Sequence, residues 1–132
     1  MTDTELLEAA RTAKEGAYAP YSRFRVGAAL VGKSGRVYTG ANVENASYSV
    51  TCCAERVALF KAVTDGERDF TAIAVTSDSD SLTYPCGVCR QALNEFAPDM
   101  HVLSSSNDLK YEKTTLERLL PHAFSGKEME QE

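Results

Sequence analysis

Two short cysteine motifs, well separated along the chain, could together hold a metal ion beside a carboxylate. The first covers residues 51–56 and the second residues 85–91. Thiolates are zinc ligands, and Zn²⁺ bound by three protein side chains keeps one coordination position for water. A carboxylate next to that position can take a proton from the water and pass it on. The motifs therefore predict hydrolytic chemistry from four residues, namely the metal ligands Cys53, Cys86 and Cys89 and the proton carrier Glu55.

The spacing of the three cysteines suits one shared metal ion. Cys86 and Cys89 lie three residues apart at a predicted helix start, so both sulfurs share a face. Cys53 also begins a predicted helix, where unpaired N–H groups and the helix dipole favour a thiolate. Three thiolates give the zinc site a net charge of about −1, which weakens it as a Lewis acid. We expect the helix dipoles, and a hydrogen bond from Arg56 to a thiolate, to offset this charge.

Other uses of these residues are weaker explanations. Cys52 could complete a closed four-thiolate site, but adjacent cysteines point in different directions, and a buried apolar thiol is the simpler expectation. A redox pair formed by Cys86 and Cys89 would leave Glu55 without a role. Glu55 is offset by about 200° from the first ligand on a helix, which favours a place beside the water over a fourth ligand position.

Size and composition predict a cytoplasmic protein with one domain over residues 1–132. The chain has 43% hydrophobic and 25% charged residues, which is ordinary for a globular protein. Its net charge of −5, with no run of basic residues, argues against a nucleic-acid partner. Without a charged, apolar leader or an apolar run of about 20 residues, neither secretion nor a membrane span is expected. Four cysteines then fit a reducing compartment.

Apolar periodicity and turn residues predict alternating helices and strands. Helices are expected at residues 3–17, 53–64, 86–96 and 114–120, with Thr2 or Asp3 capping the first and Thr51 the second. Strands are expected at residues 24–31, 37–42, 70–76, 101–103 and 110–114. This order predicts an α/β fold, a three-layer α/β/α sandwich around a mixed, roughly five-stranded sheet, followed by a polar, frayed tail at about 125–132.

The cysteine and glutamate pattern resembles the signature of zinc nucleoside deaminases. The similarity extends to segments 18–30, 40–48 and 119–124, which resemble the first strand region, the ribose-binding segment and the C-terminal motif of small homotetrameric cytidine deaminases. A cysteine stands where nucleic-acid and nucleotide deaminases usually have histidine, which points to free nucleosides. The resemblance covers nearly the whole chain apart from roughly the last eight residues.

The resemblance implies a function and a set of site residues. Cytidine or 2′-deoxycytidine would be hydrolysed to uridine or 2′-deoxyuridine and ammonia, in pyrimidine salvage, with one Zn²⁺ per subunit and Glu55 as the proton shuttle. Asn42 and Glu44 would bind the ribose hydroxyls, Phe24 would pack against the nucleoside, and the Ala54 backbone would contact the pyrimidine edge. Three further residues would reach into a neighbouring subunit's site in a homotetramer: Ala46, Tyr48 and Phe124.

The residues alone give these positions less specific roles. The two phenylalanines would ordinarily be core residues. Asn42 and Glu44, two apart in an extended segment, point to one side, and buried polar groups of this kind suit a sugar diol.

Three other functions remain open. A deaminase of a nucleoside antibiotic would share the metal site, although segment 42–45 favours an ordinary ribonucleoside. A non-catalytic module stapled by zinc would need a closed metal site and no Glu55. RNA or DNA editing is disfavoured by the acidic charge and the lack of a basic channel.

Overall fold

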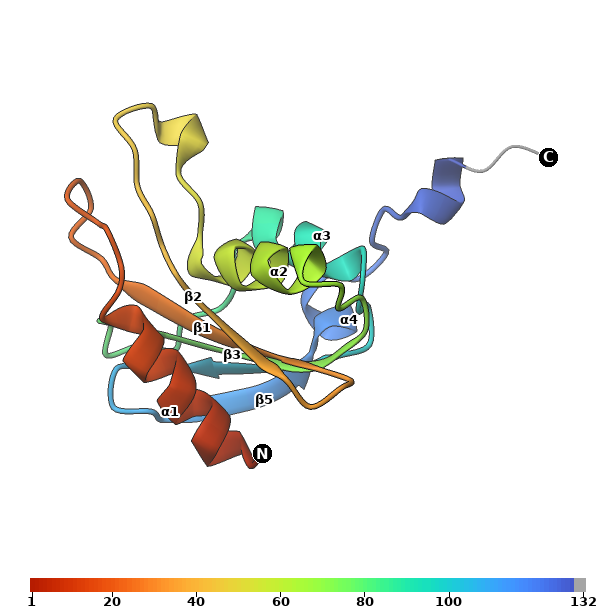
Figure 1. Cartoon of the computed structure of the whole chain (residues 1–132), viewed down its shortest axis with the longest axis horizontal. Helices are drawn as coiled ribbons and strands as arrows, with labels where there is room; N and C mark the ends of the chain where they lie inside the picture. The colour runs from red at the N-terminus through yellow and green to blue at the C-terminus, as the bar shows by residue number, and fades with distance from the viewer. Residues whose placement is uncertain (130–132) are drawn as a thin grey trace.

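A five-stranded sheet with helices on both faces forms the body of the protein (Figure 1). The computed structural model describes residues 1–129. The α-helices in this range are α1 (Asp3–Lys14), α2 (Ala54–Thr64), α3 (Gly87–Asn94) and α4 (Leu116–Leu119). The strands are β1 (Val26–Gly32), β2 (Val37–Ala41), β3 (Phe70–Ser77), β4 (His101–Ser105) and β5 (Tyr111–Thr115). Two 3-10 turns are present, η1 (Tyr48–Val50) and η2 (Gly126–Met129).

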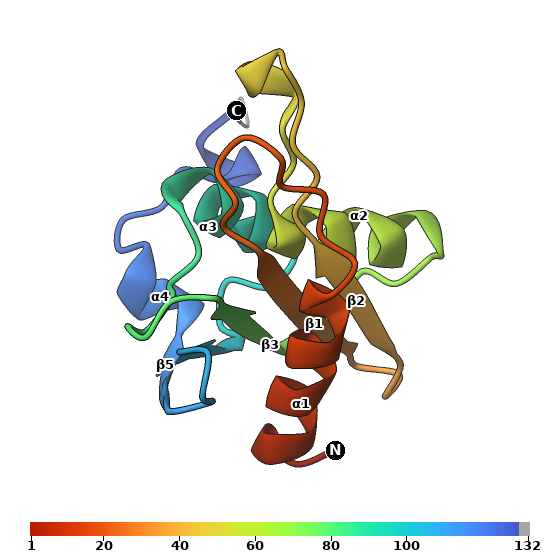
Figure 2. The same ribbon diagram turned by 90° about the vertical axis from the view of Figure 1, so that its left-hand side faces the viewer.

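The sheet is mixed, with strand order β2-β1-β3-β4-β5. Strands β3 and β4 are parallel and the other neighbouring pairs are antiparallel. A parallel pair needs a crossover connection, which α3 supplies here. Helix α1 covers one face, and α2 and α3 cover the other (Figures 1 and 2). The predicted three-layer α/β/α architecture is therefore confirmed.

Alternation along the central strands divides the core between the two faces. Successive side chains of a strand point to opposite sides of the sheet. Side chains of β1, β3 and β4 that join the α2 and α3 cluster are Ala28, Leu30, Ile73, Val75 and Val102. The side chains between them pack against α1, and these are Ala29, Ala74 and Leu103. Helices α1, α2 and α3 thus pack against one shared sheet.

Helix α1 starts as predicted and ends earlier. Thr2 forms a capping box with Glu5, since its side chain accepts the Glu5 N–H and the Glu5 carboxylate accepts the Thr2 N–H. The helix ends at Lys14 and not at residue 17. The cause lies in tertiary pairing, because the N–H of Tyr18 donates to the carbonyl of Asn42 and the chain must leave the helix to reach it.

The starts of α2 and β1 also differ from the prediction. Thr51 does not cap α2, whose N-cap is Cys53. Strand β1 begins at Val26 and not at residue 24, because the N–H groups of Phe24 and Arg25 donate to the side chains of Ser22 and Asp78.

Within residues 1–129, no helix has both the length and the apolar character needed to cross a bilayer. The predicted frayed tail is structured at Gly126–Met129, which form η2, while residues 130–132 lie outside the described residues.

Candidate metal centre and active site

The N-terminal ends of α2 and α3 bring the three predicted ligands together. Cys53 is the N-cap of α2, Cys86 is the N-cap of α3, and Cys89 lies in the first turn of α3. Their sulfur atoms all lie within 4.8 Å of one another, and those of Cys53 and Cys86 are 3.9 Å apart. Cys89 is buried while Cys86 is exposed, so the cluster can be reached from one side.

The cluster fits Zn²⁺ with one open position. Zn–S bonds of about 2.3 Å in a tetrahedral site require sulfurs about 3.8 Å apart, close to the spacing of Cys53 and Cys86. In the described part of the chain, no fourth cysteine, histidine or carboxylate joins the group. Cys52 lies outside it, so the closed four-thiolate alternative is not formed. A three-sulfur site of this kind keeps room for water.

Hydrogen bonds within the cluster favour the thiolate form of Cys53, which can bind a cation. A hydrogen bond from the Cys89 thiol and another from Arg56 lower the pKa of Cys53 to about 5. The Nη2 atom of Arg56 lies 3.5 Å from the sulfur of Cys53, as the sequence analysis expects. The shared hydrogen bond and burial raise the pKa of Cys89. One thiolate is therefore present near neutral pH, and a bound metal ion would replace the proton held between the two sulfurs.

Glu55 is buried beside this cluster, with 4% of its surface exposed. Burial raises the pKa of its carboxyl group to about 7, and the neighbouring Cys53 thiolate adds to that increase. A group with this pKa can both accept and release a proton near neutral pH. Glu55 lies outside the group of metal donors, as predicted.

Gly40 of β2 determines how closely the start of α2 approaches the sheet. A Cβ atom at this position would lie within 3.0 Å of the carbonyl oxygen of Ala54 and the amide nitrogen of Ala58. Only glycine permits this backbone contact. This contact therefore sets the distance of Cys53 and Glu55 from β2.

Asn42 is buried and holds the segment that contains Phe24. Its Oδ1 accepts the Val26 N–H at 2.9 Å, and its Nδ2 donates to the Phe24 carbonyl at 2.9 Å. One N–H and one lone pair of the amide remain for a ligand. The resemblance implies a ribose-binding role for Asn42, but no local pattern predicts this structural contact, because residues 42 and 24 lie on different segments.

Glu44 is held by the loop that follows α1. Its carboxylate accepts the backbone N–H groups of Tyr21 at 3.0 Å and Ser22 at 3.1 Å, and also the Ser22 hydroxyl. These hydrogen bonds, the hydroxyl's first, lower the pKa of Glu44. The Ser22 hydroxyl also accepts the Phe24 N–H. Ser22, to which the sequence analysis gave no role, therefore links two predicted substrate-binding residues.

Val43 places the predicted ribose-binding segment next to the metal ligands. Its backbone pairs with Tyr18 on one side and with Cys52, the residue before the first metal ligand, on the other. The segments around residues 17–25 and 43–52 leave the sheet side by side (Figures 1 and 2). Between them is a hollow of about 370 Å³, lined by Tyr21, Ser22, Glu44, Asn45, Tyr48 and Thr51.

The residues predicted to serve a neighbouring subunit are exposed. Ala46 and Tyr48 lie on the projecting segment, where Tyr48 is 76% exposed and contacts the ring of Tyr21 edge-on. Phe124 lies in the segment after α4 and is 58% exposed. Such large exposed apolar side chains are typical of surfaces that contact another protein.

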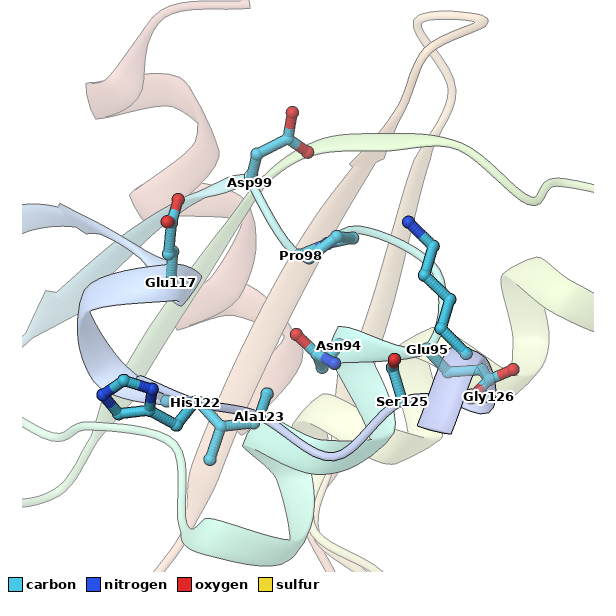
Figure 3. A pocket seen from close by; sticks show the side chains of 11 residues that line it. Asn94, Glu95, Pro98, Asp99, Glu117, His122, Ala123, Ser125 and Gly126 are labelled. Carbon is cyan, nitrogen blue, oxygen red and sulfur yellow. The ribbon is translucent and has the colours of Figure 1, made fainter. Parts of the chain in front are cut away.

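A larger hollow lies away from this chemistry. It has a volume of about 790 Å³ and lies between α3, α4 and the C-terminal segment (Figure 3). None of the predicted site residues lines it. The cysteine cluster, and not this hollow, is therefore the candidate reaction site.

Comparison with known proteins agrees with this geometry. A family model described as "Cytidine and deoxycytidylate deaminase zinc-binding region" matches residues 1–105. A cytidine deaminase of Halalkalibacterium halodurans is 50% identical over 125 residues, covering 94% of this chain and 95% of the relative. A blasticidin-S deaminase of Bacillus cereus is 39% identical, covering 93% of this chain and 92% of the relative.

A solved structure gives the same result. The crystal structure of cytidine deaminase from Burkholderia pseudomallei is 48% identical, with a TM-score of 0.91, and the match covers 94% of this chain and all of the other. With three clustered thiols, a buried glutamate and this match over most of its length, the chain belongs to the zinc-dependent cytidine deaminase family.

Proposed function

We propose that this protein hydrolyses cytidine and 2′-deoxycytidine to uridine and 2′-deoxyuridine, releasing ammonia. The observation that supports this most directly is the buried carboxyl group of Glu55 beside a three-sulfur cluster with an open side. The similarity to cytidine deaminases over more than 90% of the chain supports the same reaction.

Glu55 is proposed to move the protons of the reaction. When bound by Cys53, Cys86 and Cys89, Zn²⁺ would supply a Lewis acid that makes water more acidic. Glu55 accepts a proton from the attacking water and gives it to N3 of the pyrimidine, while the water oxygen bonds to C4. A second proton then passes from the new hydroxyl group through Glu55 to the amino group. The C4–N bond breaks, ammonia leaves, and the C4 carbonyl remains.

The surrounding residues are proposed to bind the nucleoside. Glu44 keeps one lone-pair position for a ribose hydroxyl, and Asn42 keeps one donor and one acceptor position. The N–H of Ala54, at the first position of α2, has no acceptor within the helix and is available to the pyrimidine edge. Phe24 is placed by Ser22 and Asn42 to pack against the nucleoside.

A homotetramer with shared sites is proposed as the working form. Its support is the exposed apolar surface of the two projecting segments and of Phe124, which a single chain leaves in water. A neighbouring copy would cover this surface and bring Ala46, Tyr48 and Phe124 to a site. A cytoplasmic location and a role in pyrimidine salvage are part of the proposal. Four cysteines without disulfides in the structure suit a reducing compartment.

Deamination of a nucleoside antibiotic is the second candidate, and the Bacillus cereus relative is the observation in its favour. An ultraviolet assay of cytidine, deoxycytidine and blasticidin S side by side separates the two. Turnover of the antibiotic alone would overturn the proposed substrate. Absence of any deamination would instead favour a structural zinc module.

The role of Glu55 is tested by Glu55→Ala. The variant should keep its zinc, because Glu55 is not among the metal donors, and should lose nearly all turnover. Zinc is measured by mass spectrometry and turnover by absorbance, with exposed Glu117→Ala as the matched control. Full activity in Glu55→Ala would refute the assignment.

A further inference from the structure

The C-terminal segment that contains Phe124 is attached to α3 through one carbonyl group. The Phe124 carbonyl accepts a hydrogen bond from Nε2 of Gln91 at 2.8 Å and a longer one from Nδ2 of Asn94 at 3.5 Å. Within residues 1–129, no other side-chain hydrogen bond to residues 121–124 is present. Figure 3 shows Asn94 on α3 facing this segment.

The donors belong to the helix that provides two metal ligands. Gln91 and Asn94 are three residues apart on α3 and share a face. On the same helix, Arg90 donates to the carbonyl of Leu119 at 2.8 Å and to that of Pro85, just before the first ligand of this helix, at 2.7 Å. Helix α3 therefore binds the segment at residue 119 and again at residue 124.

Phe124 lies in a segment without helix or strand structure, so a hydrogen bond such as that from Gln91 is needed to fix the position of its ring. The side chain of Phe124 is 58% exposed, so its own chain packs little against it. Ordering a mobile segment when substrate binds costs conformational entropy, and ordering it beforehand lowers that cost. A hydrogen bond to the carbonyl fixes the residue from which the ring extends.

We propose that Gln91 is a positioning residue for Phe124. Its amide holds the Phe124 carbonyl at a fixed place on α3, so that the ring is presented in one orientation to the nucleoside site of a neighbouring subunit. This inference rests on the proposed role of Phe124 in substrate binding. It adds a residue whose effect passes through Phe124 and does not involve contact with the substrate.

A double-mutant cycle on the zinc-loaded, assembled enzyme tests the proposal. The variants are Gln91→Met, which keeps length without a donor, Phe124→Ala, and the two combined. Gln91→Met should raise KM for cytidine about 3- to 10-fold, the range expected for one lost hydrogen bond, and change kcat less than about twofold. The double variant should match Phe124→Ala alone, since the contact has nothing to position once the ring is absent.

Two controls separate positioning from general damage. Glu95 lies at the end of the same helix, and its exposed side chain makes no hydrogen bond within residues 1–129. The Glu95→Met variant should therefore behave as the parent enzyme. Gln91→Glu keeps the shape but replaces the donor with an acceptor, and should raise KM as Gln91→Met does. Zinc content, Tm and oligomeric state are measured for each variant and should stay unchanged.

The possible failures are distinguishable. If Phe124→Ala leaves KM unchanged, the proposed role of Phe124 is wrong, and this inference fails with it. If Phe124→Ala raises KM but the two effects multiply in the double variant, Gln91 acts independently and only this inference is overturned. An unchanged KM in Gln91→Met, or a joint loss of zinc, Tm and kcat, also overturns it.

Discussion

The guanidinium of Arg56 and the sulfur of Cys53 are 3.5 Å apart at the start of α2. In the described part of the chain, the Nε atom of Arg56 is buried and has no hydrogen-bond partner, so the guanidinium is not fully satisfied by the protein. A thiolate pulled toward this cation gives less electron density to a metal ion.

Replacing Arg56 with Gln should therefore lower zinc affinity or kcat by about 10- to 100-fold, the range for residues that support metal ligands. The measurements are zinc titration against a competing chelator and steady-state kinetics with cytidine. Arg56→Lys keeps the charge and should lose less. Unchanged affinity and kcat in Arg56→Gln would contradict the expectation.

Cys86→Ala and Cys52→Ala should behave differently although both remove a thiol. Cys86 belongs to the sulfur cluster and Cys52 does not, so only the first variant should purify with little zinc. Removing zinc from the parent protein with a chelator should lower Tm, because a ligand bound to the folded state stabilises it. Equal zinc content in both variants would show that the cluster is not the metal site.

Gly40→Ala should damage the site although it replaces none of the proposed site residues. The new Cβ would press on the backbone of Ala54 and Ala58 and push the start of α2 away from β2. We expect a loss of about 1–3 kcal/mol in the free energy of unfolding, together with reduced zinc content. Gly126→Ala is the matched control, because nothing lies within 4 Å of a Cβ at that position. Denaturant unfolding and metal analysis measure both effects.

Asp78 should make an acid-sensitive contribution to stability. It accepts hydrogen bonds from Arg25 at 3.1 Å and pairs with the buried Lys14 at 3.1 Å. The Arg25 hydrogen bonds, followed by those of Lys14, lower the pKa of Asp78 from 3.8 to about 2. Because the folded pKa lies below the unfolded one, the stabilisation is complete above about pH 4 and is lost as the pH falls toward 2.

Asp78→Asn should thus be less stable than the parent near neutral pH, by about 1–2 kcal/mol, and the difference should shrink below pH 4. The figure is modest because the Asp78 side chain is 30% exposed and Lys14 keeps the Ser77 carbonyl and Asn107 as partners. Urea unfolding of both proteins between pH 2.5 and 7 measures the difference. A difference that is constant over this range would show that Asp78 does not titrate as described.

The pairing of Cys86 with Cys89 was predictable because its information is local. A pair of cysteines three residues apart at a helix start must share a face, and alternation within strands separates two buried faces. The partners that hold the proposed substrate-binding residues were not predictable. Ser22, for example, contacts Glu44 across 22 residues of sequence, and Gln91 contacts Phe124 across 33.

Helix ends followed the same rule. The cap at Thr2, one of the two predicted, forms within four consecutive residues and is confirmed; the structure shows that it is a capping box with Glu5. The end of α1 depends on the pairing of Tyr18 with Asn42, which no local pattern contains. Lys14 shows most clearly what local patterns miss. A lysine on an amphipathic helix is expected in water, but Lys14 is buried and paired with Asp78.

Because the backbone of Val43 pairs with both Tyr18 and Cys52, the number of residues in its segment determines which way the neighbouring side chains point. Neighbouring residues in an extended chain face opposite ways, so one inserted or deleted residue near position 43 would turn both Asn42 and Glu44 to the wrong side. The sulfur cluster would survive such a change, because its helices start elsewhere. We therefore expect a one-residue insertion or deletion in this segment to abolish nucleoside turnover while zinc binding is kept.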